Sequence, residues 1–278
     1  MYVCIFICFA TKAIHLECFS DLTTVSFIET LKRLISRRGK PAKLLTDNAK
    51  NFVGASLGIK KLYKLLCKPD DVLAGYLASE EIEWNFLPPR APNFGGLWEV
   101  DVKSFKYYLK RVVDNLKLTF EEFNCIVIQI EGMLNSRPLF PLSSEIDEFE
   151  VLTPAHFLIG RPLYALIEPN LTNMNENRLK SWLKISNRIF QFIWKKWSND
   201  YLNNLQERNK WRFCKNNVKI GDMILVKEDN LPPLKWAIGK IEAVFPGVDN
   251  KIRVAEIKTA FGHYKRPISK LCLLPMNE

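Results

Sequence analysis

The sequence predicts an α/β protein: a layered domain of strands and helices, then a helical segment, then a small β-barrel. In the front half, strand-like and helix-like segments alternate, which is typical of strands covered by a helical layer. A long helical stretch rich in tryptophan follows, and short strand-like segments separated by turn signals occupy the end. With 47% hydrophobic and 25% charged residues, the composition of the 278 residues excludes a disordered or fibrous chain.

The first segments predict a hairpin followed by a helix. Residues 2–10 form a continuous apolar, β-prone run, so we expect a central strand covered on both faces. A second run, residues 13–19, follows after Thr11-Lys12, which indicates a tight turn. Residues 24–38 carry apolar side chains at helical spacing, and Gly39-Lys40-Pro41 predicts the end of that helix.

The rest of the front half completes the order strand, strand, helix, strand, helix, strand, helix, helix. The expected elements are a short strand at 43–46, a helix that carries Leu57, Lys60, Lys61 and Lys64, a strand at 82–87, a long helix from Gly95-Gly96 to about residue 113, and a helix at 119–136. This order predicts an α/β layer sandwich.

The back of the chain is expected to fold separately. A helical stretch from about residue 176 to 212 contains four tryptophans, Trp182, Trp194, Trp197 and Trp211. The predicted short strands lie at 223–226, 236–244, 252–257 and 264–271, with turn signals between them. We therefore expect a core domain at 1–165, a helical linker at 166–212 and a basic β-barrel at 213–278.

The charge distribution supports this division. The chain has 40 Lys and Arg against 30 Asp and Glu, a net charge of +10, yet residues 1–165 hold 20 basic and 19 acidic side chains. Residues 166–278 hold 20 basic and 11 acidic side chains. A basic C-terminal part predicts a polyanionic partner, nucleic acid before membrane.

The cysteines and the N-terminal apolar run bear on localisation. The seven cysteines are an odd number and widely scattered, which favours a reducing compartment over a disulfide framework. The run at residues 2–10 is too short to span a bilayer and lacks a basic start, so it predicts a strand rather than a secretory signal. We expect an intracellular protein, in the nucleus or cytoplasm, that is not secreted.

Asp47 is the first candidate site residue. It directly follows the predicted strand at 43–46, and α/β sheets hold their ligands at the carboxyl ends of strands. An ordinary Asp-Asn turn is the alternative interpretation, and it would be favoured if the motif stood alone.

Glu99 begins a second candidate motif. Lys103, Lys106 and Lys110 follow it at spacings that put all four side chains along one face of the predicted helix. An acid followed by three lysines suits a metal ion beside a phosphate backbone. The alternative is a solvated helix face with Glu–Lys pairs, worth about 0.2–0.5 kcal/mol each.

Three residues of the predicted barrel are candidate DNA contacts: Lys235, Trp236 and Lys240. Here a tryptophan lies close to two lysines, which suits stacking and phosphate contact. The tryptophans of the helical stretch are more typical of packing. Asp47 and Glu99 together would supply half or more of a two-metal site, in which two ions about 3.5–4 Å apart clamp the oxygens of a phosphodiester.

The front half resembles the integrase core of BEL/Pao-type LTR retrotransposons, which has an RNase H-like fold. The resemblance lies in Tyr2–Phe6, Thr11–Glu17, Ser20–Thr24, Ser36–Pro41, Asp47-Asn48, Asn51–Ala55, Ala91-Pro92, Phe94–Glu99, Leu134–Pro138, Leu152–Pro154 and Phe157–Pro162. The back half resembles the basic, SH3-like domain that follows this core. Its matching residues are Trp194–Trp197, Tyr201-Leu202, Gln206–Arg208, Lys210-Trp211, Gly221-Asp222, Trp236, Gly239-Lys240, Pro246-Gly247, Arg253-Val254 and Arg266-Pro267.

The resemblance implies DNA integration by 3′-end processing and strand transfer. Three acids would bind two Mg²⁺ or Mn²⁺ ions, with Asp47 at the second acid position and Glu99 at the third. The first strand and its acid are expected to be missing, as is the N-terminal zinc module, so catalysis is expected to be impaired. DNA (element ends and target duplex) and a second copy of the chain are the implied partners, with no membrane. The alternative hypothesis is a non-catalytic DNA-binding remnant or domesticated protein.

Overall fold

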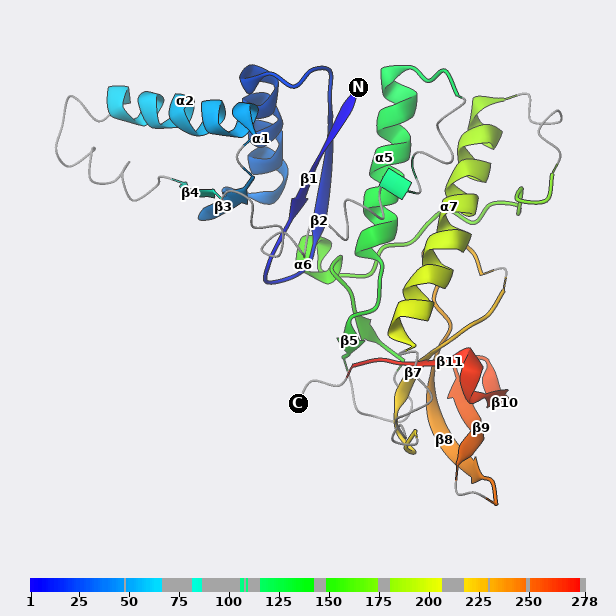
Figure 1. The fold of residues 1–278 in the computed structure, drawn as a ribbon. Coiled ribbons are helices and arrows are strands. Elements are labelled where there is room, and N and C mark those ends of the chain that lie inside the picture. The colour runs from blue at the N-terminus through cyan, green and yellow to red at the C-terminus, as the bar shows by residue number, and fades with distance from the viewer. Residues whose placement is uncertain are drawn as a thin grey trace. The chain divides into compact units, whose positions relative to one another are not determined.

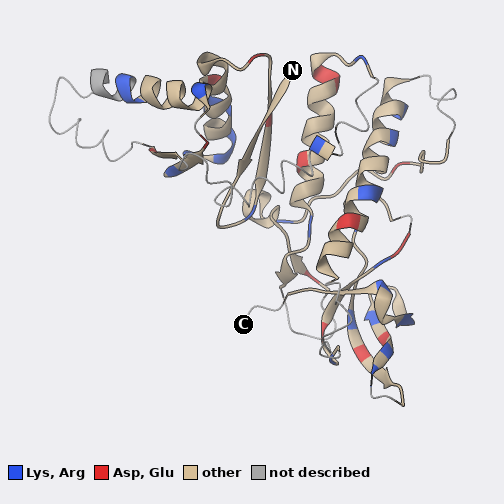
Figure 2. Ribbon diagram, viewed as in Figure 1, with Lys and Arg blue, Asp and Glu red and all other residues tan. Residues whose placement is uncertain are grey.

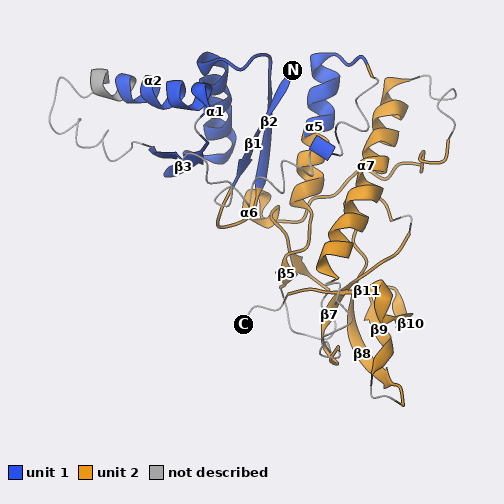
Figure 3. Ribbon diagram, viewed as in Figure 1, with its two compact units in different colours: residues 1–7, 14–110, 117–127 blue, residues 8–13, 111–116, 128–278 orange. Residues whose placement is uncertain are grey.

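The computed structural model divides the chain into two compact units (Figures 1 and 3). The first unit contains residues 1–7, 14–110 and 117–127, and the second contains residues 8–13, 111–116 and 128–278. The structure describes residues 1–47, 49–66, 82–86, 106–107, 109, 116–142, 149–174, 181–206, 218–229, 231–248 and 251–275. Within these residues the protein is a mixed α/β structure.

The first unit starts with the predicted hairpin. Strand β1 (Tyr2–Ile7) pairs antiparallel with β2 (Ile14–Phe19), from Tyr2 opposite Phe19 to Ile7 opposite Ile14. All residues of β2 are buried, whereas those of β1 are half-buried or exposed. The prediction that the first run is a central strand covered on both faces was therefore wrong, because β1 pairs only with β2 among the described residues. The buried strand is β2.

Helix α1 (Thr24–Arg38) has the predicted bounds, and its ends show why. The Thr23 hydroxyl accepts a hydrogen bond of 3.2 Å from the Ser26 amide, which caps the first turn. Gly39 has a φ of +85°, and its N–H donates to the Ile35 carbonyl at 2.9 Å. A positive φ favours glycine, and Pro41 follows, so the helix ends there.

Helix α2 (Lys50–Leu66) packs closely against α1. A Cβ atom built on Gly54 would lie 2.4 Å from the Thr24 hydroxyl oxygen, so glycine lets the two helices approach this closely without displacing the Thr24 side chain. Strands β3 (Lys43–Thr46) and β4 (Glu83–Phe86) pair in parallel, with Thr46 opposite Phe86.

A hydrophobic core lies in the described part of the first unit. Its buried members are Phe27, Leu31, Leu34, Ala55 and Trp84, and half-buried side chains from β1, β3 and α2 pack against them. The core thus joins the antiparallel pair β1–β2 and the parallel pair β3–β4, although the described residues form no hydrogen-bonded ladder between the two pairs. The predicted mixed sheet is present as these two separate pairs.

Helix α5 (Phe120–Asn135) passes from the first unit into the second. Three short elements follow it, strand β5 (Phe140–Pro141), strand β6 (Val151–Leu152) and helix α6 (His156–Ile159), and β5 pairs antiparallel with β6. The sequence did not predict these three elements because two to four residues are too few to show a periodic pattern.

The second unit contains helix α7 (Trp182–Leu205), where a helical stretch was predicted. It also contains a five-stranded antiparallel sheet in the order β10-β9-β8-β7-β11. The strands are β7 (Met223–Val226), β8 (Ile238–Pro246), β9 (Ile252–Thr259), β10 (Gly262–Pro267) and β11 (Leu271–Leu273), with a short 3₁₀ helix (Ile268–Lys270) before β11. The described residues show an open sheet, so the predicted barrel closure is not observed.

Strand β7 has a core on each face. Ile224 and Val226 pack with Ile241, Ala255 and Ile257 on one face of the sheet. Met223 and Leu225 pack on the other face with Leu202 of α7. This accounts for a strand that is apolar at every position, because alternate side chains point to opposite faces and both faces are covered. No described helix is long and apolar enough to cross a membrane.

Candidate catalytic carboxylates and nucleic-acid interface

Asp47 lies where the sequence predicts it, directly after β3 at the carboxyl end of the parallel strand pair. Its side chain is exposed, and its Oδ1 accepts a hydrogen bond of 3.0 Å from the Ala49 amide. The Trp84 indole N–H donates to the Thr46 hydroxyl at 3.0 Å, which ties the end of β3 to β4. The carboxylate therefore projects from a tethered strand end toward solvent.

The second carboxylate motif falls largely outside the described residues. Glu99, Lys103 and Lys110 are not described, whereas Lys106 is helical and exposed. The distance between the carboxylates of Asp47 and Glu99 therefore stays a prediction, as does the alignment of the three lysines.

The local chemistry of Asp47 suits a divalent metal. Mg²⁺ and Mn²⁺ prefer oxygen ligands, and Oδ2 of Asp47 makes no hydrogen bond with any described residue. The described residues contain no cluster of three or more His, Cys, Asp or Glu that could hold a metal ion. Asp47 thus fits as one ligand, and the rest of a site would have to come from elsewhere.

The three candidate DNA contacts of the back half differ in exposure. Lys235 is exposed, and Trp236 is half-buried. Lys240, on β8, is only 4% exposed, so it would have to move to reach a phosphate. The Trp236 ring packs edge-on against Trp194 and Trp197, at centroid distances of 5.0 and 5.8 Å. Contact of these three residues with DNA stays a prediction.

Lys235 and Trp236 also line a cavity in the second unit, between α7 and the segment that joins β7 to β8. Lys195 and Ser198 of α7 lie on the opposite wall. Acidic side chains line it too, so the cavity is not purely cationic. They are Glu168, Glu228 and Asp229.

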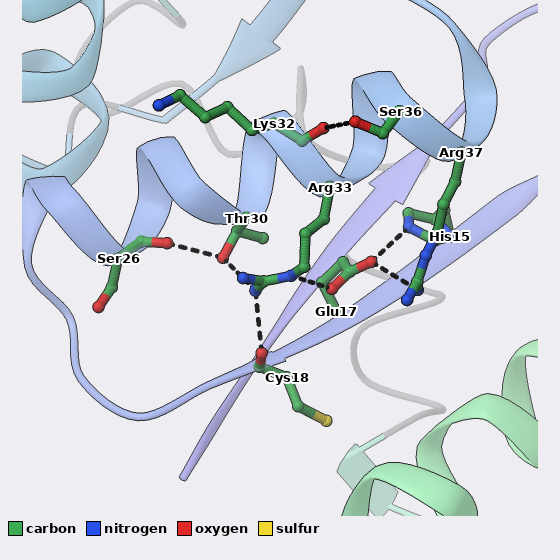
Figure 4. Close-up of polar contacts among 9 residues, drawn as sticks. All are labelled: His15, Glu17, Cys18, Ser26, Thr30, Lys32, Arg33, Ser36 and Arg37. Carbon is green, nitrogen blue, oxygen red and sulfur yellow. Dashed lines mark hydrogen bonds and ion pairs between the residues drawn. The ribbon is translucent and has the colours of Figure 1, made fainter.

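The most elaborate polar cluster was not predicted from the sequence. Glu17 is 5% exposed on β2, and its two oxygens accept hydrogen bonds from His15 at 3.0 Å, Arg37 at 2.9 Å and Arg33 at 2.7 Å (Figure 4). Burial alone would raise the pKa of Glu17, but the hydrogen bonds from His15 and Arg33 and the charges of both arginines hold that pKa below its usual value. The sequence signal was a polar pair, His15 and Glu17, inside an otherwise apolar strand.

Together these features define a mixed α/β protein with an exposed carboxylate at the end of a parallel strand and a C-terminal five-stranded antiparallel sheet. Residues 180–274 match a family described as "Family of unknown function (DUF5641)". The fold is similar to a chain in the cryo-electron microscopy structure of the simian T-cell lymphotropic virus intasome in complex with PP2A regulatory subunit B56 gamma. The sequence identity is 13% and the TM-score 0.40, over 99% of this chain and 73% of that chain. No curated protein matches the sequence.

Proposed function

We propose that this chain is a retroelement integrase of the BEL/Pao type that acts on DNA by metal-dependent phosphodiester transesterification. Asp47 and Glu99 would bind Mg²⁺ or Mn²⁺, and the metal would activate the attacking oxygen and stabilise the leaving one. The resemblance implies a third acid ligand in addition to Asp47 and Glu99. The same resemblance implies self-association.

The observation that carries the proposal is the position of Asp47. Its carboxylate is exposed at the carboxyl end of a parallel strand, three residues before the start of α2, and α/β proteins place ligand-binding groups at such strand ends. The Thr46–Trp84 hydrogen bond restrains this strand end, and Oδ2 is available to a metal. The motif residues quoted above support assigning this position to an integrase rather than to another α/β enzyme.

DNA would contact the lysines of both halves of the chain. Lys103, Lys106 and Lys110 would approach the phosphates beside the metal site, and Lys235, Trp236 and Lys240 would contact the duplex from the C-terminal sheet. Such contacts release counterions, so DNA affinity should fall steeply as salt rises.

A strand-transfer assay tests the catalytic proposal. A labelled duplex with a recessed 3′ end is incubated with the protein, a plasmid and Mn²⁺, and joined product is separated on a gel. Product should form, disappear with EDTA, and be abolished by Asp47→Asn and by Glu99→Gln. Glu121→Gln is the matched control, because Glu121 is an exposed acid of α5 that belongs to neither motif, and it should leave the product unchanged.

Two results would contradict the catalytic proposal. One is product that survives both Asp47→Asn and Glu99→Gln. The other is a wild-type protein that binds DNA with strong salt dependence yet yields no joined product, which would favour the non-catalytic DNA-binding alternative.

A further inference from the structure

Two arginines on successive turns of α1 converge on one buried carboxylate. Arg33 and Arg37, which we call the arginine pair, both ion-pair with Glu17, through different oxygens (Figure 4). Arg33 also donates to the Cys18 carbonyl at 3.1 Å and to the Thr30 hydroxyl at 3.0 Å. Its guanidinium is therefore held by three acceptor atoms, one each on Glu17, Cys18 and Thr30.

Much of the hydrogen-bonding capacity of the arginine pair is not used by these contacts. A guanidinium has five N–H donors. Toward the described residues, Arg33 uses Nε and Nη2, which leaves Nη1, and Arg37 uses Nη1, which leaves Nε and Nη2. The two side chains are 38% and 53% exposed, so these remaining donors can reach solvent.

The chain around the arginine pair is rich in basic residues, although one of them, Lys43, ion-pairs with Glu83 at 2.8 Å. Residues 32–43 contain six Lys or Arg and no Asp or Glu, and Figure 2 shows basic residues along this end of α1. Glu17 offsets only one of the two arginine charges. A pair of guanidinium groups in a positive region suits an oxyanion, because the planar fork binds phosphate oxygens two at a time.

Attachment of α1 to β2 is the simpler explanation of the cluster, but it leaves N–H donors of both arginines unbonded by the described residues. We propose that the arginine pair is a binding site for a phosphodiester of the nucleic-acid backbone, and that Glu17 is its positioning residue. The proposal deepens the proposed function, since it assigns a further contact with the same DNA. Glu17 would hold the guanidinium groups in place before the phosphate arrives, which lowers the ordering cost of binding.

The salt dependence of DNA binding tests this site. Fluorescence anisotropy with a labelled duplex in EDTA, from 50 to 300 mM NaCl, measures affinity without chemistry, so the result does not depend on whether the chain is catalytic. Arg33→Gln/Arg37→Gln should reduce the slope of log K against log salt by about one to two, since each phosphate contact contributes about 0.9. Arg37→Gln alone, at the more exposed position, should reduce it by about one.

Lys60→Gln/Lys61→Gln is the matched control. It removes the same charge from exposed positions of α2 in the same unit, and it should change the slope by less than about half a unit. If the control and the arginine variant reduced the slope of log K against log salt equally, the proposal would be overturned, because binding would then follow net charge alone.

The Glu17→Gln variant distinguishes two roles of Glu17: positioning of the two arginines, and a general effect of its charge on the attraction of DNA. Removing a negative charge raises the local positive charge, so long-range attraction alone predicts tighter binding. The positioning role predicts affinity reduced about two- to tenfold in protein that circular dichroism shows to be folded. Tighter binding would overturn the role of Glu17. Inorganic phosphate that displaces DNA from the wild type but not from Arg37→Gln, at equal ionic strength, would assign the site to a free phosphate instead of the backbone.

Discussion

The indole N–H of Trp236 donates a hydrogen bond of 3.0 Å to the carbonyl oxygen of Ser136, which lies 100 residues earlier in the chain. The bond ties the segment before β8 to the end of α5. Around it, the Trp236 ring contacts Trp194, Trp197 and Tyr201, with centroids 5.0 to 5.8 Å away. Trp236 thus lies at the centre of an aromatic cluster in the second unit.

Replacing Trp236 with Phe should destabilise the second unit. The Ser136 carbonyl would lose its donor while the aromatic cluster kept a ring, and a cost of about 1–3 kcal/mol is expected in the free energy of unfolding by urea. Trp182→Phe is the control, since Trp182 makes no hydrogen bond with a described residue, and it should change stability by less than about 0.5 kcal/mol. DNA affinity unchanged in folded Trp236→Phe would argue against the predicted DNA contact.

Two glycines of α2 should respond oppositely to alanine. The Cβ of Gly54→Ala would lie 2.4 Å from the Thr24 hydroxyl oxygen and 3.3 Å from the Thr24 methyl group, so the Thr24 side chain or the helix would have to shift. We expect a loss of about 1–3 kcal/mol, measured by thermal or urea unfolding.

Gly58→Ala supplies the comparison. Its Cβ would make ordinary contact with Ile28 at 3.6 Å, and alanine is favoured over glycine inside a helix by roughly 0.5–1 kcal/mol. Gly58→Ala should therefore be neutral or stabilising, and a large loss in both variants would contradict the packing of α2 on α1.

Stability should depend on the ionisation of Glu17. Because the folded state holds the pKa of Glu17 below its unfolded value, the carboxylate stabilises the fold above about pH 4.3. That stabilisation is lost as the pH falls through the folded pKa. Glu17→Gln should be less stable than wild type at pH 7 and should lose less stability on acidification to pH 3, as followed by urea unfolding at each pH. Parallel pH profiles for the two proteins would contradict this linkage.

The thiols should differ in their rates of alkylation. Burial raises the pKa of Cys4 to about 12 and those of Cys18 and Cys272 to about 11. Cys8 is exposed, and although partial burial opposes it, hydrogen bonds from Thr11 lower its pKa. Because the thiolate is the nucleophile, iodoacetamide at pH 7.5 should label Cys8 faster than these three cysteines, as read by peptide mass spectrometry. In urea, where the chain is unfolded, all four cysteines should be alkylated at similar rates.

Local pattern was sufficient to predict most of the described elements. Helix α1 (Thr24–Arg38), strand β3 (Lys43–Thr46) and strand β7 (Met223–Val226) have the bounds that the sequence predicts. Capping residues, glycine and proline affect the backbone within a few residues of themselves. The neighbouring side chains therefore determine where helices and strands end. The position of Asp47 after β3 was predictable for the same reason.

Contacts between distant residues were decided by the tertiary structure. The sequence by itself determined that residues 13–19 form a strand and residues 24–38 a helix. It did not show that Glu17 of one would meet Arg33 and Arg37 of the other, that Lys240 would be buried, or that Trp236 would bond to Ser136. The physical reason is that secondary structure depends on neighbours a few residues apart. Burial and ion pairing depend on which faces meet when the elements pack.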